Sequence, residues 1–169
     1  MTKKPLAYGI IAAAIFLTSC SADVVFEEPM PRQSQLQKNI PRQFHGTWID
    51  ENEENWIVDS NGILKDDEFM KNDAETQIRT NEDHIFLNMK NDAGWELYVA
   101  QLDENTLDIY SININDDRLI KKLDRLTDLE ITYDEDGKRI QVKLNPSNRE
   151  FKKMVKRKLF SYQGSLTRL

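Results

Sequence analysis

The chain has 169 residues, of which 39% are hydrophobic and 31% are charged. This composition is typical of a soluble globular domain with one modest core. The net charge of −6 makes nucleic acid an unfavourable partner, because its phosphates would repel the chain. The sequence has one cysteine, Cys20, which excludes a disulfide within a single chain.

The first 19 residues have the features of a secretory signal peptide. Lys3 and Lys4 form a basic start, and an uncharged, mainly apolar run of 11 residues follows over 7–17. That run is too short to span a hydrocarbon core, which takes about 20 helical residues, and it fits the apolar region of a signal peptide. Removal of residues 1–19 would remove two lysines and no acid, leaving a net charge of −8.

The sequence Leu17-Thr18-Ser19-Cys20 follows directly. It resembles the lipobox of bacterial lipoproteins, where an aliphatic residue, two small residues and a cysteine direct lipidation and cleavage. The resemblance implies a diacylglyceryl thioether on Cys20 and usually a third fatty acyl chain on its amino group, which together hold a protein firmly on a membrane. Ser21 stands where Asp would signal retention in the inner membrane, which favours the outer membrane. The alternatives are an ordinary signal peptide with a coincidental cysteine, or a short buried helix.

Residues 20–43 are predicted to be a lipidated tether. The segment after Cys20 contains three prolines and four glutamines and no glycine, a composition that is stiff and difficult to pack into a core. The apolar run over 24–26 is the exception. It could dock on the domain, lie near the lipid, or remain exposed as part of the linker.

Residues 44–169 are predicted to form a single β-rich domain. Turns rich in Asn, Asp and Gly alternate with apolar runs of strand length, a pattern that indicates successive hairpins. We expect a mainly β fold, an antiparallel up-and-down meander that closes into a small barrel or a strongly curled sheet, with one or two helices toward the C-terminus. The predicted strands lie near 44–50, 55–59, 62–70, 75–80, 84–90, 95–102, 106–114, 130–134 and 138–144.

Two helices are predicted after the main group of strands. The first, over 116–129, has apolar residues at helical spacing and two aspartates at its start. The second begins with the sequence Ser147-Asn148-Arg149-Glu150, a capping box. Its apolar stripe consists of Phe151, Met154, Val155 and Leu159, and lysines and arginines over 152–158 occupy the remaining face. That basic face could contact anionic lipid or a partner, or simply face solvent.

The sequence His45-Gly46-Thr47-Trp48 opens the first predicted strand of the domain. Its Gly-x-Trp resembles the signature of the lipocalins, a family of up-and-down barrels that hold small apolar molecules and carry a helix near the C-terminus. The resemblance implies an arginine stacked on Trp48, for which Arg139 and Arg168 are the candidates, while the Thr-Asp-Tyr motif of the family is absent. The alternative is that Trp48 is a core aromatic that closes one end of a sheet.

No pattern of catalytic or metal-binding residues is evident. The two histidines, His45 and His84, fall at separate strand starts, and the sequence has neither a Gly-rich phosphate loop nor a Gly-x-Ser-x-Gly motif. The acidic run 134–136 followed by Gly137 offers part of a calcium loop, but it lacks the later bidentate glutamate and is interpreted as a hairpin turn. We therefore expect no cofactor, no metal and no enzymatic activity.

Two functions follow from these observations. The first is a membrane-anchored, lipocalin-like module that binds a small apolar or amphipathic ligand at the cell envelope. The second is a structural or interaction protein with a filled core that presents a surface to another envelope component. An apolar internal void of about 300 Å³ or more would favour the first.

Overall fold

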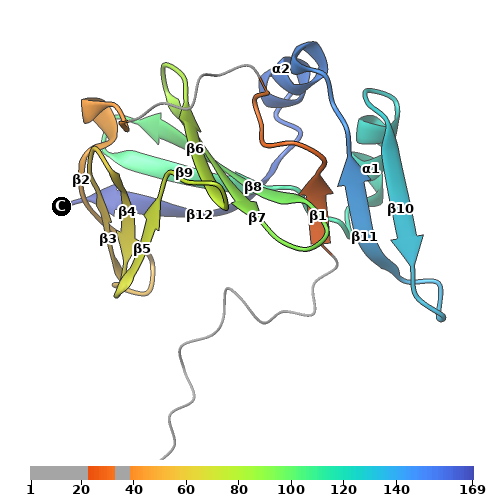
Figure 1. Ribbon diagram of the computed structural model, residues 1–169, viewed down its shortest axis with the longest axis horizontal. Helices are drawn as coiled ribbons and strands as arrows, with labels where there is room; N and C mark the ends of the chain where they lie inside the picture. Colours follow the sequence, from red (N-terminus) through yellow and green to blue (C-terminus); the bar gives the residue numbers. More distant parts are fainter. Residues whose placement is uncertain (1–22, 33–38) are drawn as a thin grey trace, which may run out of the picture.

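The computed structural model describes residues 23–32 and 39–169. These residues form a mixed sheet of 12 strands, two α-helices and one short 3₁₀-helix (Figure 1). The mainly β class and a helix near the C-terminus are thus confirmed.

The first hairpin series contains four antiparallel strands that pair in chain order. The strands are β2 (Gly46–Ile49), β3 (Asn55–Val58), β4 (Gly62–Lys65) and β5 (Glu68–Lys71). The single strand predicted over 62–70 is in fact two strands, because the chain turns at Asp66, which has a positive φ of 52°.

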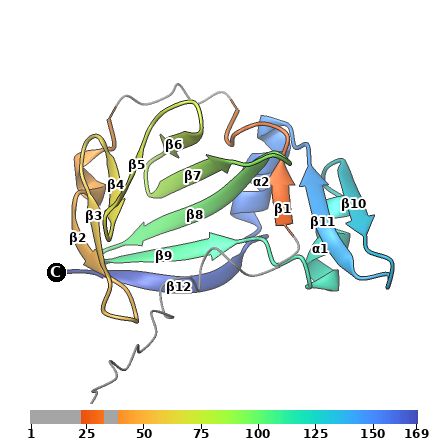
Figure 2. The same ribbon diagram turned by 60° about the horizontal axis from the view of Figure 1, so that its bottom comes forward.

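The second series again pairs in chain order. Its strands are β6 (Thr76–Thr80), β7 (His84–Lys90), β8 (Trp95–Asp103) and β9 (Thr106–Ser111). Strand β12 (Ser161–Arg168) pairs with both β9 and β2 and so joins the two series. Figure 2 shows β2–β5 standing at a steep angle to β8, β9 and β12, so that the sheet curls.

The sheet is nevertheless not closed. Strands β5 and β6 follow one another along the chain but do not pair, and the structure therefore shows no barrel. The expectation of a purely antiparallel meander is also wrong, because β1 (Asp23–Phe26) runs parallel to β11 (Arg139–Leu144). Strand β11 pairs on its other side with β10 (Leu129–Tyr133).

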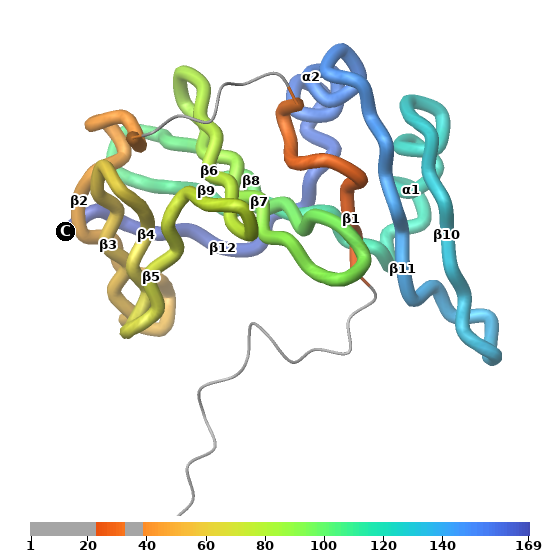
Figure 3. Tube along the Cα trace, viewed as in Figure 1, coloured from red at the N-terminus to blue at the C-terminus, as the bar shows by residue number. Residues whose placement is uncertain are grey.

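Strand β1 corrects the prediction of a tether over residues 20–43. Val25 and Phe26 are fully buried, as are Met30 and Ile40 farther along the segment, so the folded domain does not begin at residue 44. The docking alternative for residues 24–26 is the one observed, since these apolar residues complete a sheet edge that β11 leaves unpaired. In Figure 3 the segment from β1 onward passes between β7 and β11.

Strand β12 is absent from the predicted strands. Its sequence is mainly polar, Leu166 is its one buried residue, and its register shifts between Tyr162 and Gly164. Alternation of apolar and polar residues, the signal used for the other strands, is therefore missing.

Both helices were predicted, although the first is shorter than expected. Helix α1 (Asp117–Asp124) begins at Asp116, whose carboxylate accepts hydrogen bonds from the Arg118 and Leu119 N–H groups. Helix α2 (Asn148–Lys156) has the predicted capping box, in which Glu150 accepts from the Ser147 N–H at 2.8 Å.

Strands β7–β9 separate two apolar cores. The helix core lies between these strands and α1, α2, β1 and β11, and the inner core lies within the curl of the sheet. Adjacent residues on β7 show the division, since Phe86 belongs to the helix core and Ile85 to the inner core. Because successive side chains on a strand point to opposite faces, one strand supplies both cores.

The helix core generates a test of the predicted stripe on α2. Phe151 is 1% exposed and its ring lies edge-on to Phe26 and Phe86, with centroids 6.3 and 5.6 Å away. Phe151→Ala should lower the free energy of unfolding by about 3–5 kcal/mol, whereas loss of the cap in Ser147→Ala should cost about 1 kcal/mol. Urea melts would measure both, with the exposed neighbour Lys152→Ala as the control. A Phe151→Ala protein that melts like this control would contradict the packing.

Candidate functional site

The predicted lipidation site, Cys20, lies outside the described residues. The first described residue, Asp23, stands three positions after it in the sequence. The remaining predicted residues can be located, and the structure adds two features that the sequence did not reveal.

Gly46 and Trp48 lie on β2, at the end of the inner core. The Trp48 side chain is fully buried, and its indole N–H donates to the Phe44 carbonyl at 3.1 Å from the 3₁₀-helix Arg42–Phe44. The Arg168 guanidinium lies over the indole ring at 4.4 Å from its centroid, a cation–π geometry. Of the two candidate arginines, Arg168 is therefore the one stacked on Trp48.

The other candidate, Arg139, is engaged elsewhere. Its guanidinium donates to the Asp117 carboxylate at 2.8 Å and to the Ile114 carbonyl. The Arg139 hydrogen bond and charge lower the pKa of the Asp117 carboxyl below its ordinary value. Arg139 thus ties β11 to the start of α1.

The Trp48–Arg168 pair closes one end of the inner core. Arg168 also donates to the Gln43 carbonyl, so it joins β12 to the turn before β2. Gly46 has a φ of +145°, a conformation that side-chain-bearing residues rarely adopt, and a Cβ there would lie 3.8 Å from the Arg168 side chain. Trp48 is thus a core aromatic that closes one end of the sheet, and Arg168 makes the stack that the lipocalin resemblance implied.

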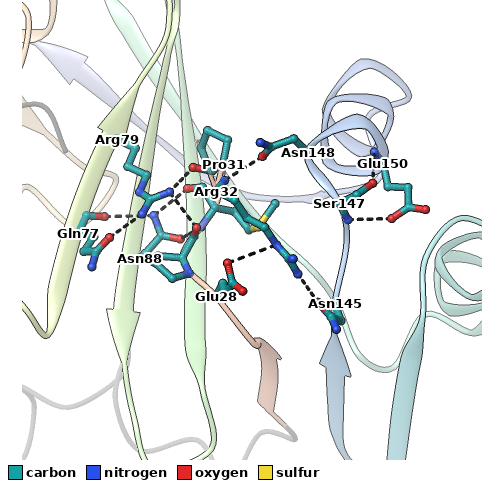
Figure 4. Close-up of polar contacts among 12 residues, drawn as sticks. Glu28, Pro31, Arg32, Gln77, Arg79, Asn88, Asn145, Ser147, Asn148 and Glu150 are labelled. Carbon is teal, nitrogen blue, oxygen red and sulfur yellow. Dashed lines mark hydrogen bonds and ion pairs between the residues drawn. The ribbon is translucent and has the colours of Figure 1, made fainter. Parts of the chain in front are cut away.

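The first feature missed by the sequence reasoning is a clamp on the N-terminal segment, residues 27–32 (Figure 4). The side chain of Asn88, on β7, is fully buried and accepts from the Met30 N–H at 2.6 Å. It also donates to the Met30 carbonyl at 2.9 Å. One side chain thereby satisfies both backbone groups of a buried residue that has no strand partner.

Arg79 forms the second part of the clamp. It is 7% exposed, and one guanidinium nitrogen donates to the carbonyls of Pro29, at 3.0 Å, and Pro31. Its other terminal nitrogen donates to Gln77 at 2.7 Å. Burial lowers the pKa of the Arg79 guanidinium, and the Glu28 carboxylate opposes that effect.

The far end of the segment is joined to α2. The Arg32 N–H donates to the Asn148 side chain at 2.9 Å, and the Arg32 guanidinium donates to Asn145 and lies 3.6 Å from Glu28. A sequence signal for the clamp existed at Asn88, a polar residue on the same strand face as the buried Phe86. The partner of that polar residue could not be read from the sequence.

The second feature is an open hollow on the outer surface of α2. It is lined by Asn148 and by four cations, Arg149, Lys152, Lys153 and Lys156, which we name the α2 basic face. The side chains of this face lie on the opposite side of the helix from the buried Phe151 and Met154. The sequence predicted these cations, but the hollow that they line follows from the structure.

The histidines and the acidic turns have local roles. His45 Nε2 lies 2.7 Å from the Ile40 carbonyl and His84 Nδ1 lies 2.5 Å from Asp83. Asp134 accepts hydrogen bonds from the Asp136 and Lys138 N–H groups, which confirms the turn between β10 and β11. Within residues 23–32 and 39–169, no group of three acidic, histidine or cysteine side chains is placed to hold a metal ion.

Comparisons with protein families, with curated protein sequences and with solved structures give no significant match. Among the helices of the described part of the chain, none has the length and apolarity needed to cross a membrane. The function must therefore be inferred from the geometry of the chain itself.

The clamp can be tested through its central residue. Asn88→Ala would leave the buried N–H and carbonyl of Met30 without partners, and each such group costs about 1–3 kcal/mol. We expect a loss of about 3 kcal/mol or more of unfolding free energy, together with faster proteolysis of the N-terminal segment. Limited proteolysis with mass spectrometry would locate the cleavage. The exposed Asn105→Ala should behave like wild type, and equal protection of both variants would contradict the clamp.

Proposed function

We propose that this chain is a bacterial envelope lipoprotein, anchored through lipid on Cys20, that presents a surface to another envelope component. The absence of Asp at position 21 favours the outer membrane as its location. The observation that carries the interaction role is the filled inner core.

That core leaves the interior of the curled sheet occupied by large side chains. Phe44 and Trp48 are fully buried there, and the Trp48–Arg168 pair closes one end. The remaining buried members are Ile40, Val58, Ile63, Ile78, Ile85, Leu107 and Leu166. An open hollow lies outside the sheet, on α2, and the aliphatic stems of charged side chains make up most of its lining. A filled interior and an outer face that carries four cations suit a protein that acts through its surface.

The anchor would also fix the orientation of the domain. Asp23 stands three positions after Cys20, and an extended chain spans about 3.3–3.6 Å per residue, so β1 would begin within about 11 Å of the lipid-bearing cysteine. Strands β1 and β11 run parallel, away from that point, and α2 follows β11. Helix α2 would therefore stand at the end of the domain far from the membrane, as its position relative to the start of β1 in Figure 1 indicates.

A lipocalin-like binding module is the second candidate. It is favoured by the Gly46, Trp48 and Arg168 arrangement and by the up-and-down order of the strands around the inner core. In that proposal β2–β9 and β12 form a strongly curled, barrel-like sheet, with the unpaired β5–β6 edge as the entry for an apolar ligand. The candidate requires the inner core to open, since large side chains now fill it.

The anchor is testable by metabolic labelling. Cells supplied with an alkyne fatty acid should label the wild-type chain, and Cys20→Ser should lose the label and the partition into a detergent phase. Ser19→Ala keeps a small residue before the cysteine and should label normally. Undiminished labelling of Cys20→Ser would overturn the lipoprotein proposal.

The two candidate functions differ in what the purified protein carries. Mass spectrometry of organic extracts from native protein should detect no stoichiometric apolar molecule if the core is filled. Leu107→Ala serves as the comparison variant, because loss of this side chain would leave an apolar cavity in the inner core. Such a cavity would admit a hydrophobic probe, which the wild-type protein should not bind. Recovery of a bound apolar ligand from the wild-type protein would favour the binding module.

A further inference from the structure

We propose that the α2 basic face binds an anionic glycan polymer of the cell envelope. This inference rests on the proposed function, because it names the presented surface and the chemistry of its partner. Four observations carry it: the local charge, the spacing of the cations, their position relative to the anchor, and the lack of apolar anchors among them.

The charge is concentrated at α2. Six of the ten residues over 149–158 are Lys or Arg, in a chain whose net charge is −6. The one acid among them, Glu150, accepts the Ser147 N–H in the capping box. Within the part of the chain that the structure describes, no ion pair engages Arg149, Lys152, Lys153 or Lys156. These cations therefore remain available to an external anion.

The spacing gives a linear array. Arg149, Lys153 and Lys156 recur at helical intervals, and at 1.5 Å of rise per residue they extend over about 10 Å of the helix axis. Lys152 widens the row, and all four side chains border one hollow. A row of flexible point charges matches a chain with repeated anionic groups better than a single small anion.

The position excludes the anchoring bilayer as the partner. The α2 basic face stands at the far end of β11 from the anchor, whereas the turn between β10 and β11 lies at the anchor end. That turn carries Glu135 and Asp136, which anionic headgroups would repel. The partner of α2 must therefore come from the aqueous side.

The chemistry of the face favours a polymer over a folded acidic protein. Protein interfaces depend on a few buried aromatic or aliphatic anchors. The exposed large apolar side chains lie on the strands and at the C-terminus, and none is on α2: they are Ile57, Phe69, Tyr133, Ile140, Tyr162 and Leu169. Binding at α2 would thus be mainly Coulombic, which suits a partner that makes many weak charge contacts.

The experiment uses the full chain in a non-ionic detergent and three fluorescent polymers. Polygalacturonate is the anionic glycan, dextran the neutral one, and poly-glutamate the anionic peptide. We expect anisotropy to report binding of polygalacturonate and not of dextran, with affinity falling as NaCl rises from about 50 to about 300 mM. Poly-glutamate should bind no more tightly than polygalacturonate at equal charge, because the face offers no apolar anchor for a peptide.

Two double variants localise the site. Lys152→Glu with Lys156→Glu should reduce the affinity for polygalacturonate by about tenfold or more. Lys121→Glu with Lys122→Glu makes the same change in net charge at exposed positions on α1 and should leave the affinity within about twofold. If the α2 charge reversal perturbs the far-UV spectrum, Lys152→Gln with Lys156→Gln replaces it and should show a smaller loss in the same direction.

Several outcomes would overturn the inference. Equal losses in the α1 and α2 variants would mean that net charge alone drives binding. Tighter binding of poly-glutamate would point to an acidic protein partner, and no binding of any polymer would remove the site. These results are independent of the labelling of Cys20. If labelling did not depend on Cys20 but polygalacturonate still bound, the lipoprotein proposal would be rejected and the proposed binding site on α2 would be kept.

Discussion

The fold depends on the pairing of one buried amide with one backbone residue. Asn88 satisfies both the N–H and the carbonyl of Met30, where no strand supplies partners. An unpaired buried backbone group would oppose burial of the N-terminal segment. With the pair made, the segment can bring Phe26 into the helix core and Arg32 to the start of α2. The edge of β11, the helix core and the position of α2 are linked through this contact.

The strand that carries Asn88 also contributes side chains to both apolar cores. Strand β7 directs Ile85 into the curl of the sheet and Phe86 toward α2, and Asn88 lies on the same side as Phe86. The polar side chain of Asn88 therefore lies beside the helix core, where the N-terminal segment passes over β7. The segment then covers the strand face beyond Phe86 and meets Arg79, whose guanidinium binds the carbonyls around the prolines. A composition that is stiff and difficult to pack is thus compatible with an ordered segment, because side chains of β6 and β7 supply the hydrogen bonds that strand pairing would otherwise give.

Features encoded over a few residues could be predicted from the sequence, and features that join distant segments could not. The capping box of α2 and its buried stripe are local patterns, and the structure has both. The pairing of β1 with β11 joins opposite ends of the chain, and no periodicity in either strand specifies the partner. Arg168 could be named only as one of two arginines for Trp48, because the choice depends on β12, a strand with almost no alternation. Whether the sheet closes is decided at the β5–β6 edge, where the two hairpin series do not pair as strands and the Asn72 side chain bonds to the backbone of Ile78 instead.

The parallel arrangement of β1 and β11 determines how the domain would respond to mechanical load. A pull on the chain before Asp23 acts along the axis of β1, and β11 lies beside it in a register of four residue pairs. Load in that direction shears the hydrogen bonds between β1 and β11, so all of them bear the load at once. In a hairpin pulled open from its end, the bonds would instead break one after another. After β1, the side chains of Asn88 and Arg79 hold the segment over 29–31 through hydrogen bonds to its backbone. The junction is therefore built to transmit tension from the N-terminus into the sheet without first unravelling the segment that connects them.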